Sequence, residues 1–535
     1  MTPLAPSASL SAAPPSPNAR PADPFDAPLA HLPLALSSVA DLRTAEAEAA
    51  AALPPHTLMA RAGGAAARWL AERGEREARP VWLAAGPGNN GGDALVTAVE
   101  LLRLGVQVEV CLPVEPKPED ARWALTLARE AGVPISPEPP ASLDAYGWCV
   151  DGLFGIGLAR PVAGPFAALA EALSARSRGL GRVLALDVPS GIDADSGARV
   201  GDGPAVTATH TLSFIAAKPG LYFGDGRDHA GEIAVDTLDA APARPSATLN
   251  APALFAPCWP ARGAASHKGS FGSVAIVGGD TGMCGAPILA ARAALHAGAG
   301  KVHVGFLGDD APPYDPPFPE LMLHPARSLN PEGLSAIGIG CGLGTREHAI
   351  ETLREILALD LPLVIDADAL NLVAAHADLH SALVKRGVRH AVSILTPHPL
   401  EAARLLGTRT AEVQGERLAA ARELAARFHA IAVLKGSGTV IAEPAGRVAV
   451  NPTGNAALAT GGTGDVLGGL IAAFAAQRLP AWEAALAGVY LHGLAADCLS
   501  TLGAGPVGLA AGELAPAVRR LLNRHFYSRL APSPR

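Results

Sequence analysis

Short apolar segments alternate with glycine-rich turns and stretches of helical period along most of the chain. From Pro80 the sequence runs VWLAAGPGNNGGDALVTAVELLRLGVQVEVCL, a pattern typical of a strand, a loop, a helix and a second strand. Two further apolar segments, ending at Val150 and Leu186, are each followed by an aspartate and a glycine-containing loop. The carboxyl ends of parallel strands share one edge of a sheet, where ligands bind in open α/β folds. We therefore predict one doubly wound domain from about Leu34 to Asp236.

A second α/β series begins at Gly272. The segments SVAIVGG, KVHVGFL, AIGIG, LVID, SILTP and AVLKG alternate there with helical stretches. After Lys435 the apolar segments become short and are separated by turn residues, which predicts a β-meander before the closing helices. Residues 239–266 are rich in proline and alanine without periodicity, and we predict a linker. The expected division is a flexible tail over 1–33, one domain over 34–238, the linker over 239–266 and a second domain over 267–528.

The composition supports two globular domains. Hydrophobic residues make up 49% of the 535 residues and charged residues 17%, which suits sizeable cores and argues against extended disorder. The net charge of -8 does not favour binding to nucleic acid or to an anionic membrane, both of which are negatively charged. The longest apolar run, from Val466 to Ala476, is shorter than the roughly 20 residues of a membrane helix. The first thirty residues lack the features of a signal peptide, so we expect a cytoplasmic protein.

The loop GPGNNGGD, from Gly86 to Asp93, lies between a predicted strand and a predicted helix. It contains the G-x-G-x-x-G pattern of dinucleotide-binding proteins, whose glycines let the backbone approach a pyrophosphate at a helix N-terminus. That pattern does not require the Asn89-Asn90 pair or Asp93, and Glu109 falls within a strand instead of at its end. A merely tight strand-to-helix turn stays open as an alternative.

Three aspartates and a histidine follow predicted strands or open predicted helices. Asp151 and Asp187 would face one crevice, which suits acid/base chemistry or a cation site, although aspartate is also common in turns and helix caps. In TGNAALATGGTGDVLGGL the N–H groups of Gly462 to Gly464 would form an anion hole at a helix start, beside Asp465 as a base. A helix cap is the alternative for Asp465. His398 opens a helix in TPHPLEAARLL and would face the same sheet edge as the loop before Asp465, with a purely structural histidine as the alternative.

Lysine is rare in this chain, and it is retained beside glycine-rich turns. A compact charge next to free backbone N–H groups is a phosphate-binding arrangement. Lys268 and Lys301 can equally remain solvated. The lysines concerned are Lys218, Lys268, Lys301 and Lys435.

These motifs together resemble the bifunctional NAD(P)H-hydrate repair enzyme family, in which an epimerase domain is fused to an ADP- or ATP-dependent dehydratase domain. The resemblance covers about Leu34 to Leu522. The motifs of the first half are TLMARAGGAAA, GPGNNGGDALV, DGLFGIGLARP, LDVPSGIDADSG and KPGL. Those of the second half are HKGSFGSVAIVGG, GAPILAARAALHAGAGKV, GCGLGT, DADALN, TPHPLEA, LKGSGTV and TGNAALATGGTGDVLGG.

The resemblance implies a Rossmann-like first domain that epimerises the R and S hydrates of NADH and NADPH. Asp187 would be catalytic, because it is a carboxylate aimed at the cleft. A potassium ion would lie between two loops, the first in GPGNNGGD and the second in DGLFGIGLARP. Oxygen ligands suit such a hard cation. Its ligands would be Asn90, Asp151 and Ser190. The substrate contacts would be Asn89, Asn90, Gly91, Gly92, Asp93, Gly155, Ile156, Gly157, Leu158, Ala159, Arg160, Pro161 and Asp187.

The resemblance also implies a ribokinase-like second domain that dehydrates the S hydrate with ADP or ATP and magnesium. Asp465 would be catalytic, helping the C6 hydroxyl to attack the terminal phosphoryl group before phosphate is eliminated. The substrate contacts would be Ala286, Gly342, His398 and Asp465. The nucleotide contacts would be Lys435, Gly436, Ser437, Gly438, Thr439 and Gly464.

Two residues depart from the family pattern. Leu400 stands where glycine is usual, and its side chain would crowd the substrate near His398. Cys341 stands where proline is common, which we expect to alter loop stiffness more than chemistry. We expect a homo-oligomer acting on the hydrates of NADH and NADPH. The alternatives are a ribokinase-like kinase of a small hydroxylated metabolite with a nucleotide-sensing first domain, and a first domain that binds a partner or nucleotide without turnover.

Overall fold

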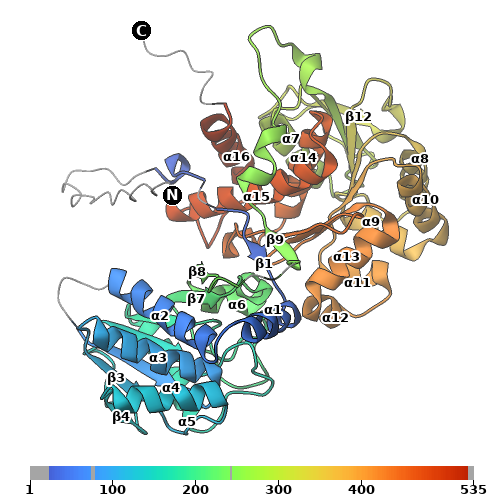
Figure 1. The fold of residues 1–535 in the computed structure, drawn as a ribbon. Coiled ribbons are helices and arrows are strands. Elements are labelled where there is room, and N and C mark those ends of the chain that lie inside the picture. The colour runs from blue at the N-terminus through green and yellow to red at the C-terminus, as the bar shows by residue number, and fades with distance from the viewer. Residues whose placement is uncertain (1–22, 30, 74–78, 241, 243, 528–535) are drawn as a thin grey trace, which may run out of the picture.

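The computed structural model describes residues 23–29, 31–73, 79–240, 242 and 244–527. Figure 1 shows two lobes, a smaller one built from the first half of the chain and a larger one built from the second. Each lobe has a largely parallel sheet covered by helices. The predicted fold class, two successive α/β units, is confirmed. None of the helices in the described ranges is long and apolar enough to span a membrane.

The smaller lobe contains a sheet of seven strands in the order β4-β3-β2-β5-β6-β7-β8, and every neighbouring pair is parallel. The chain runs outward from β2 to β4 and then returns to the other side of β2. The topological switch point, where open α/β sheets bind ligands, therefore lies between β2 and β5. The strands are β2 (Val81–Ala85), β3 (Val108–Cys111), β4 (Ile135–Ser136), β5 (Trp148–Gly152), β6 (Arg182–Leu186), β7 (His210–Phe214) and β8 (Glu232–Asp236).

Helices lie on both faces of this sheet, which explains why β2 and β5 are buried along their whole length and why β2 is entirely apolar. Helix α3 starts at the glycine-rich loop and packs most extensively against α2 and α4. The helices of the smaller lobe are α1 (Val39–Ala52), α2 (Thr57–Glu72), α3 (Asn89–Arg103), α4 (Glu119–Glu130), α5 (Pro165–Arg178) and α6 (Gly224–Ala230).

The larger sheet has eleven strands in the order β1-β9-β18-β17-β16-β15-β14-β13-β10-β11-β12. The seven strands from β16 to β12 in that order are parallel, while β17 is antiparallel to both of its neighbours. The switch point lies between β10 and β13. The strands are β1 (Ala35–Leu36), β9 (Ala247–Leu249), β10 (Ser273–Gly278), β11 (Lys301–Phe306), β12 (Met322–Pro325), β13 (Ala336–Ile339), β14 (Leu363–Ile365), β15 (Ser393–Leu395), β16 (Ile431–Leu434), β17 (Val440–Ala442) and β18 (Val448–Val450).

Two apolar clusters cover the two faces of the larger sheet. Helix α14 is apolar nearly all round because it lies between the sheet and the outer helices α7 and α15. The helices of this lobe are α7 (Gly285–His296), α8 (Glu347–Ala358), α9 (Ala367–Ala375), α10 (Ala377–Val388), α11 (Pro399–Leu406), α12 (Thr410–Gly415), α13 (Arg417–Phe428), α14 (Thr463–Ala476), α15 (Ala481–Thr501) and α16 (Ala511–His525). Short 3-10 turns are η1 (Pro24–Asp26), η2 (Pro219–Tyr222), η3 (Pro252–Leu254), η4 (Ala256–Cys258), η5 (Lys268–Phe271), η6 (Ala326–Ser328) and η7 (Ala456–Leu458).

Two short strands that the sequence pattern did not predict, β1 and β9, lie where the two lobes meet. Strand β9 falls within the expected linker, and β1 falls at the start of the expected first domain, yet both belong to the larger sheet. The N–H of Ser37 donates to the carbonyl of Ala217 in the smaller lobe, at 2.9 Å. The larger lobe's core also takes in Leu221, Tyr222 and Phe223 from the smaller one.

Part of the expected flexible tail packs on the larger lobe. Phe25 of η1 is buried in its core, and the guanidinium of Arg520 on α16 lies 4.3 Å from the Phe25 ring centre. An apolar aromatic side chain gains about 1.5–3 kcal/mol from burial, which explains why this turn is held in place. Residues 1–22 and 30 of the expected tail lie outside the described residues.

Candidate active sites

A cavity of about 200 Å³ lies at the edge of the smaller sheet, beside Asp187. Asp187 follows β6 directly, and its φ of 69° is unusual for a residue other than glycine. Such backbone strain persists at functional sites when the surroundings hold it in place. The expected contacts Asn89, Asp93 and Ile156 line the same cavity. The structure therefore brings the two predicted loops and Asp187 together.

Lys218 is the closest partner of Asp187. The ammonium group is 1% exposed and pairs with the Asp187 carboxylate, and it also donates to Ser213 Oγ at 2.9 Å and to the Phe214 carbonyl at 2.8 Å. These three bonds use all its N–H groups. Lys218 was one of the candidates for phosphate binding, but its ammonium group has no donor left for a phosphate. The buried lysine instead neutralises the carboxylate.

Asp93 and Asp187 are two carboxyl groups of one cavity with different surroundings. Burial raises the pKa of Asp93 well above its ordinary value, and the charges of Asp187 and Glu46 raise it further. Burial and Asp187 also raise the pKa of Glu46, which comes from α1. Sequence reasoning missed Glu46, because the alanine- and glutamate-rich α1 carries no motif that would mark it.

The other residues of the two loops occupy different positions. A Cβ on Gly91 would lie 1.9 Å from the carbonyl oxygen of Gly86, and one on Gly92 would lie 2.5 Å from Met59 Cε. These two glycines allow close packing and face protein atoms. In the second loop, a Cβ on Gly155 would lie 3.2 Å from Asp187 Oδ2. The rest of this loop is mostly exposed to solvent; its residues are Gly157, Leu158, Ala159, Arg160 and Pro161.

Asn90, Asp151 and Ser190 lie together beneath this cavity. Asp151 is fully buried and accepts from Ser190 Oγ at 2.7 Å and from the Ser190 N–H at 2.8 Å. Burial raises the pKa of Asp151 to about 6. Both polar atoms of the Asn90 side chain are buried without a hydrogen-bond partner, and its Cγ is 3.5 Å from the Cβ position of Gly155. Unpaired buried amide atoms and oxygen donors fit a hard cation.

The second site lies at the start of α14 in the larger lobe. Gly462, with φ of 90°, precedes the helix, and Asp465 lies in its first turn. The first N–H groups of a helix have no acceptor within it and favour an anion there. Burial raises the pKa of Asp465 to about 6, and the nearby Asp366 carboxylate adds to the rise. Asp465 is thus poised to exchange a proton near neutral pH.

Cys341 contacts the candidate base directly. It is buried, and its side chain forms a hydrogen bond with the Asp465 carboxylate. Burial and the charge of Asp465 raise the pKa of the thiol strongly, so the thiol stays protonated and donates. The sequence predicts that Cys341 alters loop stiffness more than chemistry, but the residue also interacts with the candidate base Asp465.

The glycine-rich loop after β16 meets α14 through Lys435. Its ammonium donates to Asp366 Oδ1 at 2.6 Å and lies 3.6 Å from the Cβ position of Gly464. Burial lowers the pKa of Lys435, but Asp366 and Glu401 outweigh it and the net shift is upward. Asp366 follows the strand β14 as Asp187 follows β6, and sequence reasoning used this strand-end signal for Asp151 and Asp187 but not for Asp366. Gly436 and Ser437 are exposed, whereas Gly438 is buried and Thr439 half-buried.

The remaining predicted substrate contacts lie at two places: Ala286 and Gly342 follow β10 and β13 at the switch point, and His398 follows β15. A Cβ on Gly342, whose φ is 59°, would lie 3.5 Å from Ala286 Cβ, so these two residues adjoin. His398 caps α11: its Nδ1 accepts the N–H of Leu400 at 3.1 Å and its Nε2 lies 3.2 Å from Glu401 Oε1. Burial and Lys435 lower the pKa of His398. The Leu400 side chain is 44% exposed.

Comparisons with known proteins cover both halves. A family described as NAD(P)H-hydrate dehydratase matches residues 274–514, and one described as YjeF-related protein N-terminus matches residues 55–220. The bifunctional NAD(P)H-hydrate repair enzyme Nnr of Coxiella burnetii is 39% identical over 480 residues, 88% of this chain and 95% of that protein. The protein of the same name from Escherichia coli is 36% identical over 500 residues, 90% of this chain and 93% of that protein.

Single-domain relatives match the larger lobe. The ADP-dependent (S)-NAD(P)H-hydrate dehydratase of Neisseria meningitidis is 50% identical over 268 residues, 49% of this chain and 89% of that protein. The ADP/ATP-dependent NAD(P)H-hydrate dehydratase of Bacillus subtilis, crystallised with ATP and Mg²⁺, aligns with a TM-score of 0.44 and 31% identity over 52% of this chain and 98% of that one. The full-length relatives favour cofactor repair over a metabolite kinase. The chain belongs to the family of bifunctional NAD(P)H-hydrate repair enzymes.

Proposed function

We propose that the smaller lobe interconverts the R and S hydrates of NADH and NADPH, and that the larger lobe uses ADP or ATP to dehydrate the S form. The observation that carries this proposal is the arrangement around Asp465. A carboxyl group with a pKa near 6 lies in the first turn of α14, next to the Lys435–Asp366 pair and the glycine-rich loop. A site that only bound the hydrate and the nucleotide would not need a base at that position. Transfer of a phosphoryl group to a hydroxyl uses a base there to accept the hydroxyl proton.

In the smaller lobe, Asp187 would move the proton during inversion at C6 of the hydrated ring. Its carboxylate is held by Lys218, and Oδ2 lies 3.2 Å from the Cβ position of Gly155. Asp93 lines the same cavity, and burial together with the charge of Asp187 raises its pKa. Two carboxyl groups in different surroundings can divide the roles of base and acid between them.

Potassium would be held by Asn90, Asp151 and Ser190. The unpaired Asn90 amide and the buried Asp151 carboxylate support this assignment, since both gain a partner when a cation is present. When bound, the ion supplies positive charge beside the substrate loop. Ser190 Oγ also accepts the N–H of Phe154 at 2.8 Å, which ties the loop that begins there to the same three residues.

In the larger lobe, Asp465 would take the proton of the C6 hydroxyl as its oxygen attacks the terminal phosphorus of the nucleotide. The bond from that phosphorus to the bridging oxygen breaks, releasing AMP from ADP or ADP from ATP. The C6–O bond then breaks as C5 loses a proton, so phosphate leaves and the ring double bond is restored. The first N–H groups of α14 stabilise the negative charge that develops on the phosphoryl oxygens.

Magnesium would be held mainly by the nucleotide. In the described part of the chain no three acidic, histidine or cysteine side chains gather at one point, and Mg²⁺ commonly uses one or two carboxylates plus phosphate oxygens. Asp366, 4.0 Å from the Cβ position of Gly464, fits the carboxylate role. The bound ion would offset charge on the phosphates. We also propose a cytoplasmic homo-oligomer without nucleic-acid or membrane partners; light scattering of the purified protein tests its oligomeric state.

The test uses both hydrate epimers of NADH with magnesium, potassium and either ADP or ATP, followed by near-ultraviolet absorbance. Wild-type protein should convert the whole mixture to NADH. An Asp187→Ala variant should stall once the S form is used up, and an Asp465→Ala variant should produce no NADH. Absence of NADH with either nucleotide would overturn the proposal, and a stable phosphorylated product would point to a metabolite kinase instead.

A further inference from the structure

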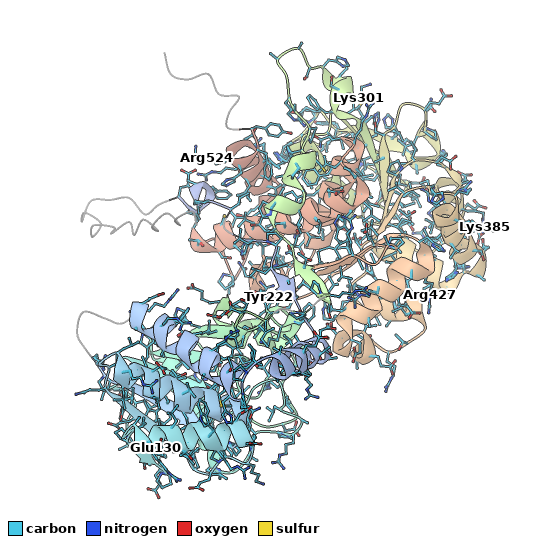
Figure 2. All side chains as sticks on the ribbon, viewed as in Figure 1. Glu130, Tyr222, Lys301, Lys385, Arg427 and Arg524 are labelled. Carbon is cyan, nitrogen blue, oxygen red and sulfur yellow. The ribbon has the colours of Figure 1, made fainter. Side chains whose placement is uncertain are left out.

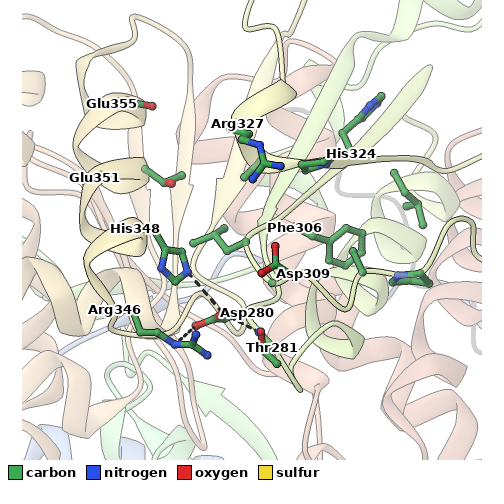
Figure 3. A pocket seen from close by; sticks show the side chains of 18 of the residues that line it. Asp280, Thr281, Phe306, Asp309, His324, Arg327, Arg346, His348, Glu351 and Glu355 are labelled. Atoms are coloured by element: carbon green, nitrogen blue, oxygen red, sulfur yellow. Dashed lines mark hydrogen bonds and ion pairs between the residues drawn. The ribbon is translucent and has the colours of Figure 1, made fainter.

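A cavity of about 770 Å³ opens at the carboxyl ends of β10, β11 and β12 in the larger lobe. Figure 3 shows its lining. One side is the start of α8, with Arg346, His348 and Glu351, and another comes from β12 and η6, with His324 and Arg327. The volume lies within the roughly 300–1,000 Å³ range of small-molecule sites.

The loops of this cavity are also those of the predicted substrate contacts. The N–H of Asp280 donates to the Gly342 carbonyl at 2.7 Å, and the N–H of Met283 donates to the Asp280 carbonyl at 2.8 Å. A Cβ on Gly342 would lie 2.9 Å from Met283 Cβ and 3.5 Å from Ala286 Cβ. The cavity therefore continues the β10–β13 switch point outward, in the direction of β11 and β12.

The nucleotide loop lies in the opposite direction. Lys435 follows β16, which is separated from β13 by β15 and β14, whereas the cavity lies on the β10 side of β13. A dinucleotide whose reacting ring is at Gly342 and Asp465 must place its remaining atoms along the sheet edge. Because the nucleotide occupies the β16 side of the reacting ring, the rest of the dinucleotide would extend to the other side, into the cavity beside Asp280.

The cavity presents two guanidinium groups suited to phosphates. Arg346 Nε lies 3.1 Å from Oδ2 of Asp280, a carboxylate that is 3% exposed and fixed by the Thr281 N–H at 2.8 Å. Among the described residues, the two terminal nitrogens of Arg346 have no hydrogen-bond partner, and Arg327 has neither hydrogen bond nor ion pair. A guanidinium oriented by a buried carboxylate, with two free nitrogens, is preorganised for bidentate phosphate binding.

Acidic groups share the lining and suit the rest of such a ligand. Asp309 and Glu351 are acceptors that can take hydrogen bonds from ribose hydroxyls, the role that acidic residues fill in other dinucleotide sites. We infer that this cavity holds the adenosine diphosphate half of the hydrated dinucleotide, with Arg346 and Arg327 on its phosphates. This assignment rests on the proposed function of the larger lobe, and it makes Arg346 and Arg327 residues that determine substrate affinity.

The first test is calorimetric titration of the full chain with ADP-ribose, while a non-hydrolysable ATP analogue saturates the nucleotide loop. ADP-ribose carries the proposed half of the substrate without its reacting ring. Wild-type protein should bind it, and Arg346→Gln and Arg327→Gln should each weaken binding at least tenfold, as loss of a charge-assisted contact predicts. Absence of binding by wild-type protein, or equal binding by both variants, would overturn the assignment.

The second test follows NADH formation from the S hydrate. Both variants should raise KM at least tenfold and leave kcat within twofold, because the contacts are remote from the reacting carbon. Arg354→Gln is the matched control, since it lies on α8 and pairs with Asp378 at 2.9 Å outside the cavity. If wild-type protein forms no NADH but binds ADP-ribose through Arg346, the proposed reaction fails while the cavity assignment stands. If both variants keep the wild-type KM, the cavity assignment is wrong while the proposed reaction stands.

Discussion

Gly438 and Tyr222 meet backbone to backbone at the junction of the lobes: a Cβ on Gly438 would lie 2.0 Å from the Tyr222 carbonyl oxygen. Figure 2 shows Tyr222 at this junction. Gly438 belongs to the proposed nucleotide loop, and Tyr222 ends the turn η2 that follows Lys218, the partner of Asp187. The segments that carry the two candidate sites are therefore in direct contact.

Arg417 reinforces this contact. Its guanidinium is buried and donates to the carbonyls of Leu434, Lys435 and Gly438, each at 3.2 Å, and lies 5.6 Å from the Phe223 ring centre. Burial lowers the pKa of Arg417 to about 10.

Gly438→Ala should destabilise the protein more than a change in backbone preference alone explains. Its φ of 72° disfavours alanine by about 1–2 kcal/mol, and the clash with Tyr222 adds about 1–3 kcal/mol. Gly446→Ala is the control, because φ is 98° there but nothing lies within 4 Å of the Cβ position. Scanning calorimetry should show the larger fall in Tm for Gly438→Ala. Equal falls would mean that the backbone at Tyr222 shifts to accommodate the methyl group without loss of stability.

Lys218→Met should leave the partly buried Asp187 carboxylate without its ion-pair partner. Removing one partner of a buried ion pair costs about 3–5 kcal/mol, and Lys218 is 1% exposed. We expect a lower urea midpoint for the transition of the smaller lobe and loss of epimerisation. Dehydration of pure S hydrate should persist under native conditions. The exposed Lys385 provides the control, since Lys385→Met should change the midpoint little. A wild-type midpoint in Lys218→Met would show that the pair does not stabilise the fold.

The dehydratase should lose activity as pH falls through about 6. As the proposed base, Asp465 must be ionised, and its pKa is about 6, so kcat/KM should drop below that pH. Cys341→Ala removes a hydrogen bond that lowers the pKa of Asp465, so the acid limb should move to higher pH. Cys341→Ser keeps a donor and should restore the wild-type limb. Identical pH profiles for all three proteins would contradict the role of this contact.

Stability should change with pH in the opposite sense to activity. The pKa of Asp465 is higher in the folded chain than its ordinary value of 3.8, so its contribution to folding is fully present below 3.8 and is lost as pH rises through about 6. At pH 8, Asp465→Asn should therefore have a higher Tm than wild type while being inactive as a dehydratase. A lower Tm for that variant would indicate that the carboxylate is well solvated or paired in the fold.

Potassium should accelerate epimerisation and stabilise the smaller lobe. Binding to the folded state alone raises the free energy of unfolding with ion concentration. Epimerisation rate and Tm should rise when KCl replaces choline chloride, and Asn90→Ala should remove both effects. Because Asp151 has a pKa of about 6, both effects should fade below that pH, as its protonated form binds a cation poorly. Asn330→Ala, in an exposed loop of the larger lobe, is the control; equal rates in both salts would exclude the proposed ion.

The local pattern of the sequence was sufficient for the α/β class and for the loops that carry chemistry. Strands such as Val81–Ala85 are continuous apolar runs, and the turns after them need glycine, so both are visible within a few residues. The same reasoning placed Asp151, Asp187 and Asp465 at strand ends or helix starts, where the structure has them.

Only the tertiary structure decided which residues meet across the chain. The two-residue strand Ala35–Leu36 is too short to show any period, yet it pairs with β9 inside the expected linker. Lys218 lies 31 residues from Asp187, and Lys435 lies 69 residues from Asp366. Such pairings depend on how the sheets bring distant segments together, a matter of long-range packing that leaves no local pattern. The sequence by itself determined the elements and the candidate groups; packing decided that Lys218 neutralises Asp187 and that Cys341 donates to Asp465.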